Sequence, residues 1–161
     1  MGSINTIKNI LWVAFISMVP IIELRGAIPV GAALELPWYT NMLAAVVGNC
    51  IPVPFILLFI RAILGWMRTC PISLFRKVAD WLFRKAEKHA DKVEKYAFWG
   101  LFVLVAIPLP GTGAWTGSLV AALFRVKPKI AVPAILLGVL GAAVIVTLIS
   151  YGVLSFLSFL L

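Results

Sequence analysis

The chain has 161 residues, of which 63% are hydrophobic and 12% are charged, and 14 Lys and Arg against 6 Asp and Glu give a net charge of +8. A soluble core of this length could not bury so much apolar surface, so the composition excludes an ordinary soluble domain and predicts an all-α integral membrane protein. Twelve of the 14 basic residues lie in 61–95 and 125–129. Such clusters are typical of cytoplasmic loops, and without a nucleic-acid motif we expect no nucleic-acid partner.

The first apolar region, residues 4–37, is interrupted by Glu23 and Arg25, and the limb after them is too short to cross about 30 Å of hydrocarbon. We expect a re-entrant hairpin whose break is formed by Gly26 and Pro29. The two charges would point apart on a regular helix but could meet in an unwound turn. Three alternatives remain open: a kinked full-length span, an Arg25 side chain that reaches the outer surface while Glu23 faces inward, and a hairpin tip at the membrane surface.

Residues 38–60 carry no charge and are long enough for a transmembrane helix. Asn49, within this segment, is a candidate buried amide that contacts a hairpin tip. Pro52 and Pro54 are expected to loosen the helix locally, because proline removes a backbone donor.

Residues 61–95 form a basic segment that we expect to lie in the cytoplasm. Within it, Ser73 to Lys95 has apolar residues at intervals of three and four, which predicts an amphipathic helix. Such a helix would either contact anionic phospholipids or simply pack beneath the membrane helices.

Residues 96–124 are expected to form a second re-entrant hairpin, because two short apolar limbs flank a break that contains Pro108, Pro110, Gly111 and Gly113. Backbone at membrane depth needs partners within the protein, so the two breaks should face each other inside the molecule.

The second break carries no charge but has a cluster of small and polar residues with an aromatic one: Gly111, Thr112, Gly113, Trp115 and Thr116. Glycine-rich backbone and a helix N-terminus present N–H groups that suit an anion such as phosphate. The alternative is a close-packed turn in which glycine only lets helices approach.

Residues 130–161 contain the last span, and their apolar tail predicts a helix that tilts, breaks near Gly152 or turns along the membrane surface. Hairpin and span occur twice, which predicts an inverted repeat with both termini outside and the basic segments inside. A thin wall around a polar centre favours a homodimer.

Other kinds of site are not indicated. The sequence has no nucleophile with a base and no metal-ligand cluster, so we expect no enzyme activity, no metal and no cofactor. Cys50 and Cys70 are too few and too oddly placed for a disulfide framework.

Three motifs, ELRGAIPVG, GNCIPVP and PLPGTGAWTGSLVAAL, resemble in order and spacing the family called putative small multidrug export proteins. That family is distantly similar to the DedA superfamily, which has two opposed re-entrant hairpins and includes translocases of undecaprenyl phosphate. The resemblance matches Glu23 to an acidic residue implicated in proton coupling. DedA proteins place arginines around the proline of the second hairpin, whereas the residues near Pro108 here include Ala106 and Leu109 and no arginine, so Arg25 would have to supply the cation.

These features lead to three hypotheses. The first is a multi-pass transporter or lipid translocase of the cytoplasmic (inner) membrane that moves an amphiphile such as a polyprenyl phosphate while Glu23 cycles its proton. The second is an exporter of small cationic or amphiphilic compounds, with Glu23 as counter-ion and Trp115 as a stacking surface. The third is a non-transporting membrane assembly or lipid-organising protein that acts through the basic helix.

Overall fold

The computed structural model describes residues 2–69, 77, 80, 90–109 and 111–160. The described part of the chain is all-helical, as the composition predicts. Its elements are α1 (Gly2–Met18), α2 (Glu23–Ala33), α3 (Trp38–Cys50), α4 (Pro52–Thr69), α6 (Ala90–Ala106), α7 (Ala114–Leu123) and α8 (Pro128–Leu160). About half of 61–95, including 15 of the 23 residues of the expected amphipathic helix, lies outside the described residues, as does Pro110.

Among the described residues, two helical segments are long and apolar enough to cross a membrane. They are Trp38–Ile60, in α3 and α4, and Pro128–Val153, in α8. The apolar helices Tyr96–Ala106 and Ala114–Leu123 are shorter, and α2 has 11 residues. At about 1.5 Å per residue α2 and α7 are each about half as long as a hydrocarbon core is thick.

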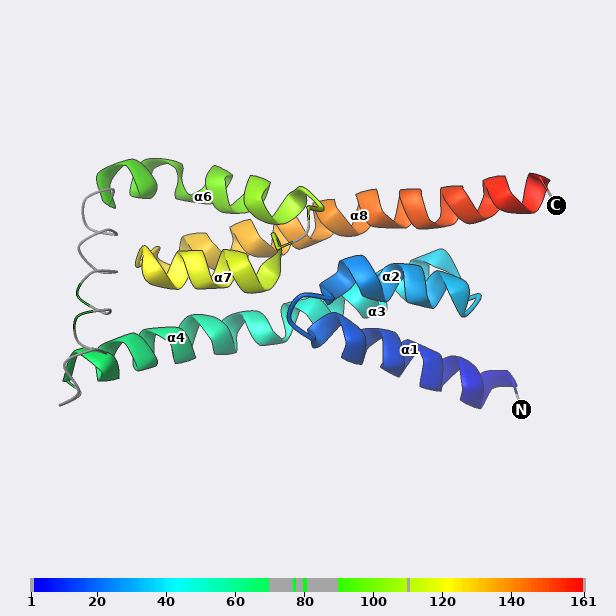
Figure 1. Ribbon diagram of the computed structural model, residues 1–161, viewed down its shortest axis with the longest axis horizontal. Coiled ribbons are helices and arrows are strands. Elements are labelled where there is room, and N and C mark those ends of the chain that lie inside the picture. The colour runs from blue at the N-terminus through cyan, green and yellow to red at the C-terminus, as the bar shows by residue number, and fades with distance from the viewer. Residues whose placement is uncertain (1, 70–76, 78–79, 81–89, 110, 161) are drawn as a thin grey trace.

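The short helices occupy two halves of the molecule that follow one another along its long axis (Figure 1). The α3–α4 rod and α8 run through most of it, whereas α1 and α2 fill the half that carries both chain termini, and α6 and α7 fill the other half. We call these the terminal end and the basic end, because exposed Lys127 and Lys129 follow α7 at the latter. The breaks between α1 and α2 and between α6 and α7 meet at the middle.

Both long rods contain proline, with different results. Between α3 and α4 the helix is interrupted at Ile51, directly before Pro52, because proline cannot donate to the carbonyl of Gly48 four residues earlier. The expected loosening is therefore confirmed at Pro52, whereas Pro54 lies inside α4. In contrast, α8 continues as one helix of 33 residues through Gly152, so the expected alternative of a break there is wrong.

The short helices form two pairs, α1 with α2 and α6 with α7. Glycines let the α3–α4 rod approach α1 and let α8 approach α6. A Cβ on Gly48 would collide with the backbone of Ala14 in α1, and a Cβ on Gly138 would lie 2.7 Å from Cβ of Val105 in α6. Such close approach is typical of helix contacts in membranes, where packing rather than water drives association. The core that results is built largely of Ala, Val, Ile and Leu.

Candidate functional site

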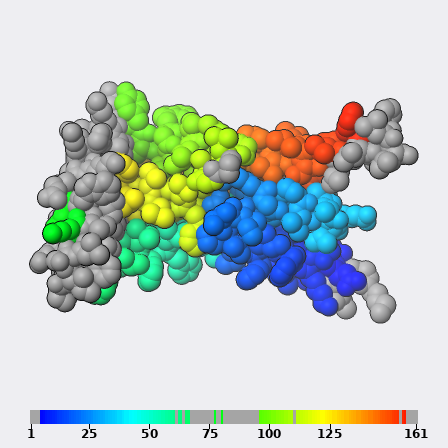
Figure 2. Space-filling model, in the orientation of Figure 1, coloured from blue at the N-terminus to red at the C-terminus, as the bar shows by residue number. Residues whose placement is uncertain are grey.

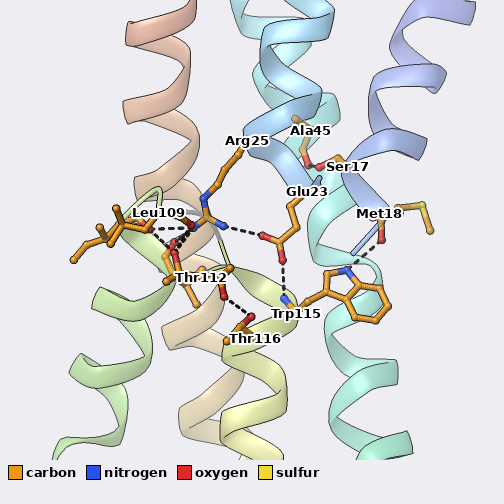
Figure 3. Close-up of polar contacts among 12 residues, drawn as sticks. Ser17, Met18, Glu23, Arg25, Ala45, Leu109, Thr112, Trp115 and Thr116 are labelled. Carbon is orange, nitrogen blue, oxygen red and sulfur yellow. Dashed lines mark hydrogen bonds and ion pairs between the residues drawn. The ribbon is translucent and has the colours of Figure 1, made fainter. Parts of the chain in front are cut away.

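The first break is the turn that joins α1 to α2. Residues Ile21 and Glu23 have left-handed backbone, with φ of 79° and 49°. Glu23 N donates to Val19 O over 3.1 Å, which closes the turn. A β-branched residue at positive φ costs about 1–3 kcal/mol, so surrounding contacts must hold it. The turn sends the Glu23 side chain toward the second break (Figure 3).

The expected break residues of this region are placed differently. Gly26 and Pro29 lie inside α2, so the prediction that they form the break is wrong. The chain turns earlier, before Glu23, and α2 tolerates Pro29 although its ring leaves the carbonyl of Arg25 without a helical donor. Gly26 has a packing role, because a Cβ there would collide with the Ile22 side chain in the turn.

The second break joins α6 to α7 through a chain of short-range bonds. Leu109 N donates to Ile107 O over 2.8 Å, and Thr112 N donates to Leu109 O over 3.2 Å. Gly111 and Gly113 have φ of 82° and 152°, values that side chains disfavour. The expected position of this break is confirmed, and α7 begins directly after Gly113.

Glu23 and Arg25 form an ion pair at the first turn of α2. Arg25 Nη1 lies 3.1 Å from Glu23 Oε2, and the two side chains are only 16% and 5% exposed. They meet because Glu23, at the start of the helix, has left-handed rather than helical backbone. The expectation that an unwound turn brings the two charges together is therefore confirmed, and neither lies on an exposed tip.

Arg25 also binds the end of α6. Its Nη2 donates to the carbonyl oxygens of Val105 (3.3 Å) and Ile107 (3.0 Å) and to Thr112 Oγ1 (3.0 Å). The last carbonyls of a helix have no partner within it and carry partial negative charge. The guanidinium therefore satisfies the C-terminal end of α6 with a matching positive charge.

Glu23 binds the opposite kind of helix end. Its Oε1 accepts a hydrogen bond of 3.1 Å from the backbone N–H of Trp115, at the N-terminus of α7. A Cβ on Gly113 would collide with Glu23 Oε2, so glycine is needed for the approach. The donors that the sequence assigned to an anion are thus engaged, at least in part, by a carboxylate of the protein itself.

A further hydrogen bond joins α7 to the end of α1. The indole Nε1 of Trp115 donates to Met18 O, the last residue of α1, over 3.1 Å. Thr112 and Thr116 stabilise the break itself, since Thr112 Oγ1 lies 2.8 Å from Ile107 O and Thr116 Oγ1 donates to Gly111 O over 2.8 Å. Sequence reasoning missed the carbonyls of α1 and α6 as partners, although every helix end leaves such groups unpaired.

Asn49 is only 1% exposed, so its expected burial is confirmed. Neither of its amide atoms has a hydrogen-bond partner among the described residues. The expected contact with a hairpin tip is therefore not a hydrogen bond in this structure. Ser17, which the sequence did not single out, is the buried polar residue that joins α1 to α3, through a 2.6 Å bond to Ala45 O.

An apolar groove of about 610 Å³ lies beside the ion pair, between α4 and α7. Trp115 connects the groove with the ion pair, because its side chain lines the groove while its backbone N–H binds Glu23. The other lining residues come from the two helices and are Pro52, Phe55, Ile56, Leu58, Phe59, Ile60, Ala62 and Leu119. Figure 2 shows the surfaces of the two halves meeting directly at the middle of the molecule, on the face turned to the viewer.

The sequence matches the family described as "Putative small multi-drug export protein" over residues 23–145. The chain belongs to this family. The match begins at Glu23, where the first break ends, and extends through the second break into α8 as far as residue 145. Membership of the small multidrug export family and two apolar helices of spanning length identify a membrane protein. Comparison with curated proteins and with solved structures gave no match.

Proposed function

We propose that this member of the small multidrug export family is a membrane transporter for amphiphilic cations, and that its substrate passes the Glu23–Arg25 pair. The observation that carries the proposal is a buried ion pair where two helix breaks meet, linked through Trp115 to an apolar groove between α4 and α7. Ionised groups at membrane depth are costly and mark substrate or ion pathways. The groove volume of about 610 Å³ is within the range of small-molecule sites.

The bonding of the pair favours a cationic head group. Three oxygen atoms at the end of α6 and in the second break already accept bonds from Arg25 Nη2, so the guanidinium keeps partners if Glu23 leaves it. A carboxylate has about four acceptor sites, and Glu23 has bonds from Arg25 and from the Trp115 N–H. A substrate cation can therefore bind Glu23 while its apolar body occupies the groove against Trp115.

The fold of this proposed transporter is an inverted repeat with an offset of 90 residues. Glu35 and Arg125 both have left-handed backbone, with φ of 57° and 53°. The turns that contain them close with matching bonds, from Leu36 N to Gly31 O and from Val126 N to Ala121 O. Opposed repeats around a central site are common in secondary transporters.

The functional side chains follow the same offset. Arg25 and Trp115 are 90 residues apart, and each binds carbonyls at the end of the first helix of the opposite pair. Within this proposal each pair is a re-entrant hairpin that enters and leaves on one side. The exposed Lys127 and Lys129 then put the basic end in the cytoplasm and both termini outside.

Flux of a fluorescent lipophilic cation into proteoliposomes tests the function. We expect Glu23→Gln to abolish flux, because the amide cannot act as counter-ion or exchange a proton. Glu35→Gln is the matched control, since Glu35 is an exposed carboxylate at the α2–α3 turn. A folded Glu23→Gln protein that transports as well as wild type contradicts the proposal.

A second candidate substrate is a phosphate-bearing carrier lipid. Arg25 Nε is buried and has no hydrogen-bond partner among the described residues, which leaves one cationic donor for an anionic head group. Binding of polyprenyl phosphate, compared with a panel of amphiphilic cations at two pH values, separates the candidates. Tighter binding of the phosphate that is lost in Arg25→Lys would favour the lipid, because lysine lacks a second planar donor.

A further inference from the structure

A buried polar network joins three helices at the terminal end of the molecule. Asn41 of α3, which is fully buried, donates through Nδ2 to Ile28 O (2.8 Å) and to Tyr151 OH (3.0 Å). The Tyr151 hydroxyl of α8 in turn donates to Leu36 O over 2.6 Å. The phenol therefore links α8 both to α3 and to the turn that follows α2.

The network joins α2, α3 and α8 beside a small groove. This groove, of about 280 Å³, lies between α2 and α8 and includes Pro29, Ile149 and Ser150 in its lining. A Cβ on Gly31 would collide with the Asn41 side chain, so α2 packs tightly on the network. Separation of α2 from α8 requires these bonds to break.

The other half of the molecule has the corresponding groove with a larger volume. Adding or subtracting 90 converts Pro29, Ile149 and Ser150 into Leu119, Phe59 and Ile60, which line the larger groove between α4 and α7. The position that corresponds to Asn41 is Ala131, which is buried but has no polar side chain. Two equivalent grooves of one fold therefore differ in volume, at about 610 and 280 Å³, and of the two equivalent positions only the one beside the smaller groove carries an amide.

We propose that Asn41 and Tyr151 form a gate that is closed in this structure, while the α4–α7 groove at the basic end is open. In the opposite state the network breaks, the α2–α8 groove widens and the α4–α7 groove narrows, as exchange of conformation between the two halves requires. The proposal rests on the proposed transport function and adds the residues that control access from the terminal end.

Thiol accessibility tests the gate without any substrate. Single cysteines replace Ser150 or its counterpart Ile60, in a protein that carries Cys50→Ala and Cys70→Ala and is reconstituted in nanodiscs, where a maleimide reaches both faces. Tyr151→Phe removes the hydroxyl that accepts from Asn41 and donates to Leu36. We expect labelling at position 150 to rise by about 30-fold, the factor given by loss of two hydrogen bonds, and labelling at position 60 to fall.

Tyr39→Phe is the matched control, because Tyr39 is exposed on α3 at the same end. Asn41→Ala is the second variant and copies the residue at the equivalent position, Ala131, so it provides the test if Tyr151→Phe does not fold. Labelling that is unchanged, that changes at one position alone or that rises at both overturns the proposal. Normal flux in a Glu23→Gln protein would contradict the proposed transport function instead. That result would not alter the labelling rates, so the two failures can be told apart.

Discussion

The two helix pairs contribute opposite kinds of group to the same site. The first pair brings a full positive and a full negative charge, whereas the second brings backbone carbonyls, backbone amides and hydroxyls. Each charge lies against the helix end of opposite sign, Arg25 at the C-terminus of α6 and Glu23 at the N-terminus of α7. The difference teaches that a broken helix and a buried ion pair stabilise each other, because each satisfies groups that lipid cannot.

Removal of one charge should have the largest effect on the contact between the two helix pairs. We expect Arg25→Ala or Glu23→Ala to lower the free energy of unfolding by about 3–5 kcal/mol, because each leaves the other charge buried without its partner. Titration with SDS in mild detergent, followed by circular dichroism, measures the loss. Lys129→Ala, at an exposed position, should stay within about 0.5 kcal/mol of wild type. If the double alanine variant costs as much as the two single variants added together, the charges are not coupled.

Gly113→Ala tests the contact between the breaks themselves. The Cβ would collide with Glu23 Oε2 at a backbone conformation that only glycine adopts readily, so we expect a loss of about 2–4 kcal/mol. Gly111→Ala is the control, because its φ of 82° is also left-handed but nothing lies within 4 Å of the added carbon. The same SDS titration should show a loss of only about 1–2 kcal/mol for Gly111→Ala. Equal losses for the two variants would remove the argument for contact.

Gly48 in α3 and Gly138 in α8 test how closely each long rod packs against the short helix beside it. We expect Gly48→Ala and Gly138→Ala each to destabilise by about 1–3 kcal/mol, with the larger loss at Gly48. At Gly48 the added carbon would overlap the Ala14 carbonyl oxygen, whereas at Gly138 the nearest atoms are less close, Val105 Cβ at 2.7 Å and Phe102 O at 2.9 Å. Gly100→Ala, on an open face of α6, should be neutral or slightly stabilising in the same titration. A larger loss at Gly138 than at Gly48 contradicts this ranking.

Trp115→Phe gives the smallest expected effect. It removes the indole donor to Met18 O but keeps an aromatic ring in the groove, so we expect a loss of about 0.5–1.5 kcal/mol and little change in binding of a lipophilic cation. Trp99→Phe, on the exposed face of α6, is the control for tryptophan replacement. Fluorescence titration with the cation measures binding, and a complete loss in Trp115→Phe would mean that the indole N–H serves the ligand rather than Met18.

Local patterns predicted much of this arrangement and failed where packing decides. Glu23 and Arg25 were recognised because charges are rare in apolar sequence, and the second break because Pro and Gly interrupt a helical pattern. The first break was misplaced onto Gly26 and Pro29, since α2 accommodates both residues and the chain turns earlier through left-handed Ile21 and Glu23. A β-branched residue at positive φ has no sequence signal, because tertiary contacts impose it.

The sequence by itself determined an all-helical membrane protein with two apolar segments of spanning length, because composition and the length of apolar runs depend on no neighbour. Only the tertiary structure decided which groups bind one another. Arg25 and Thr112 are 87 residues apart, and Asn41 and Tyr151 are 110 apart. Hydrogen bonds at such separations follow from how the helices pack, and they leave no periodic mark in the chain.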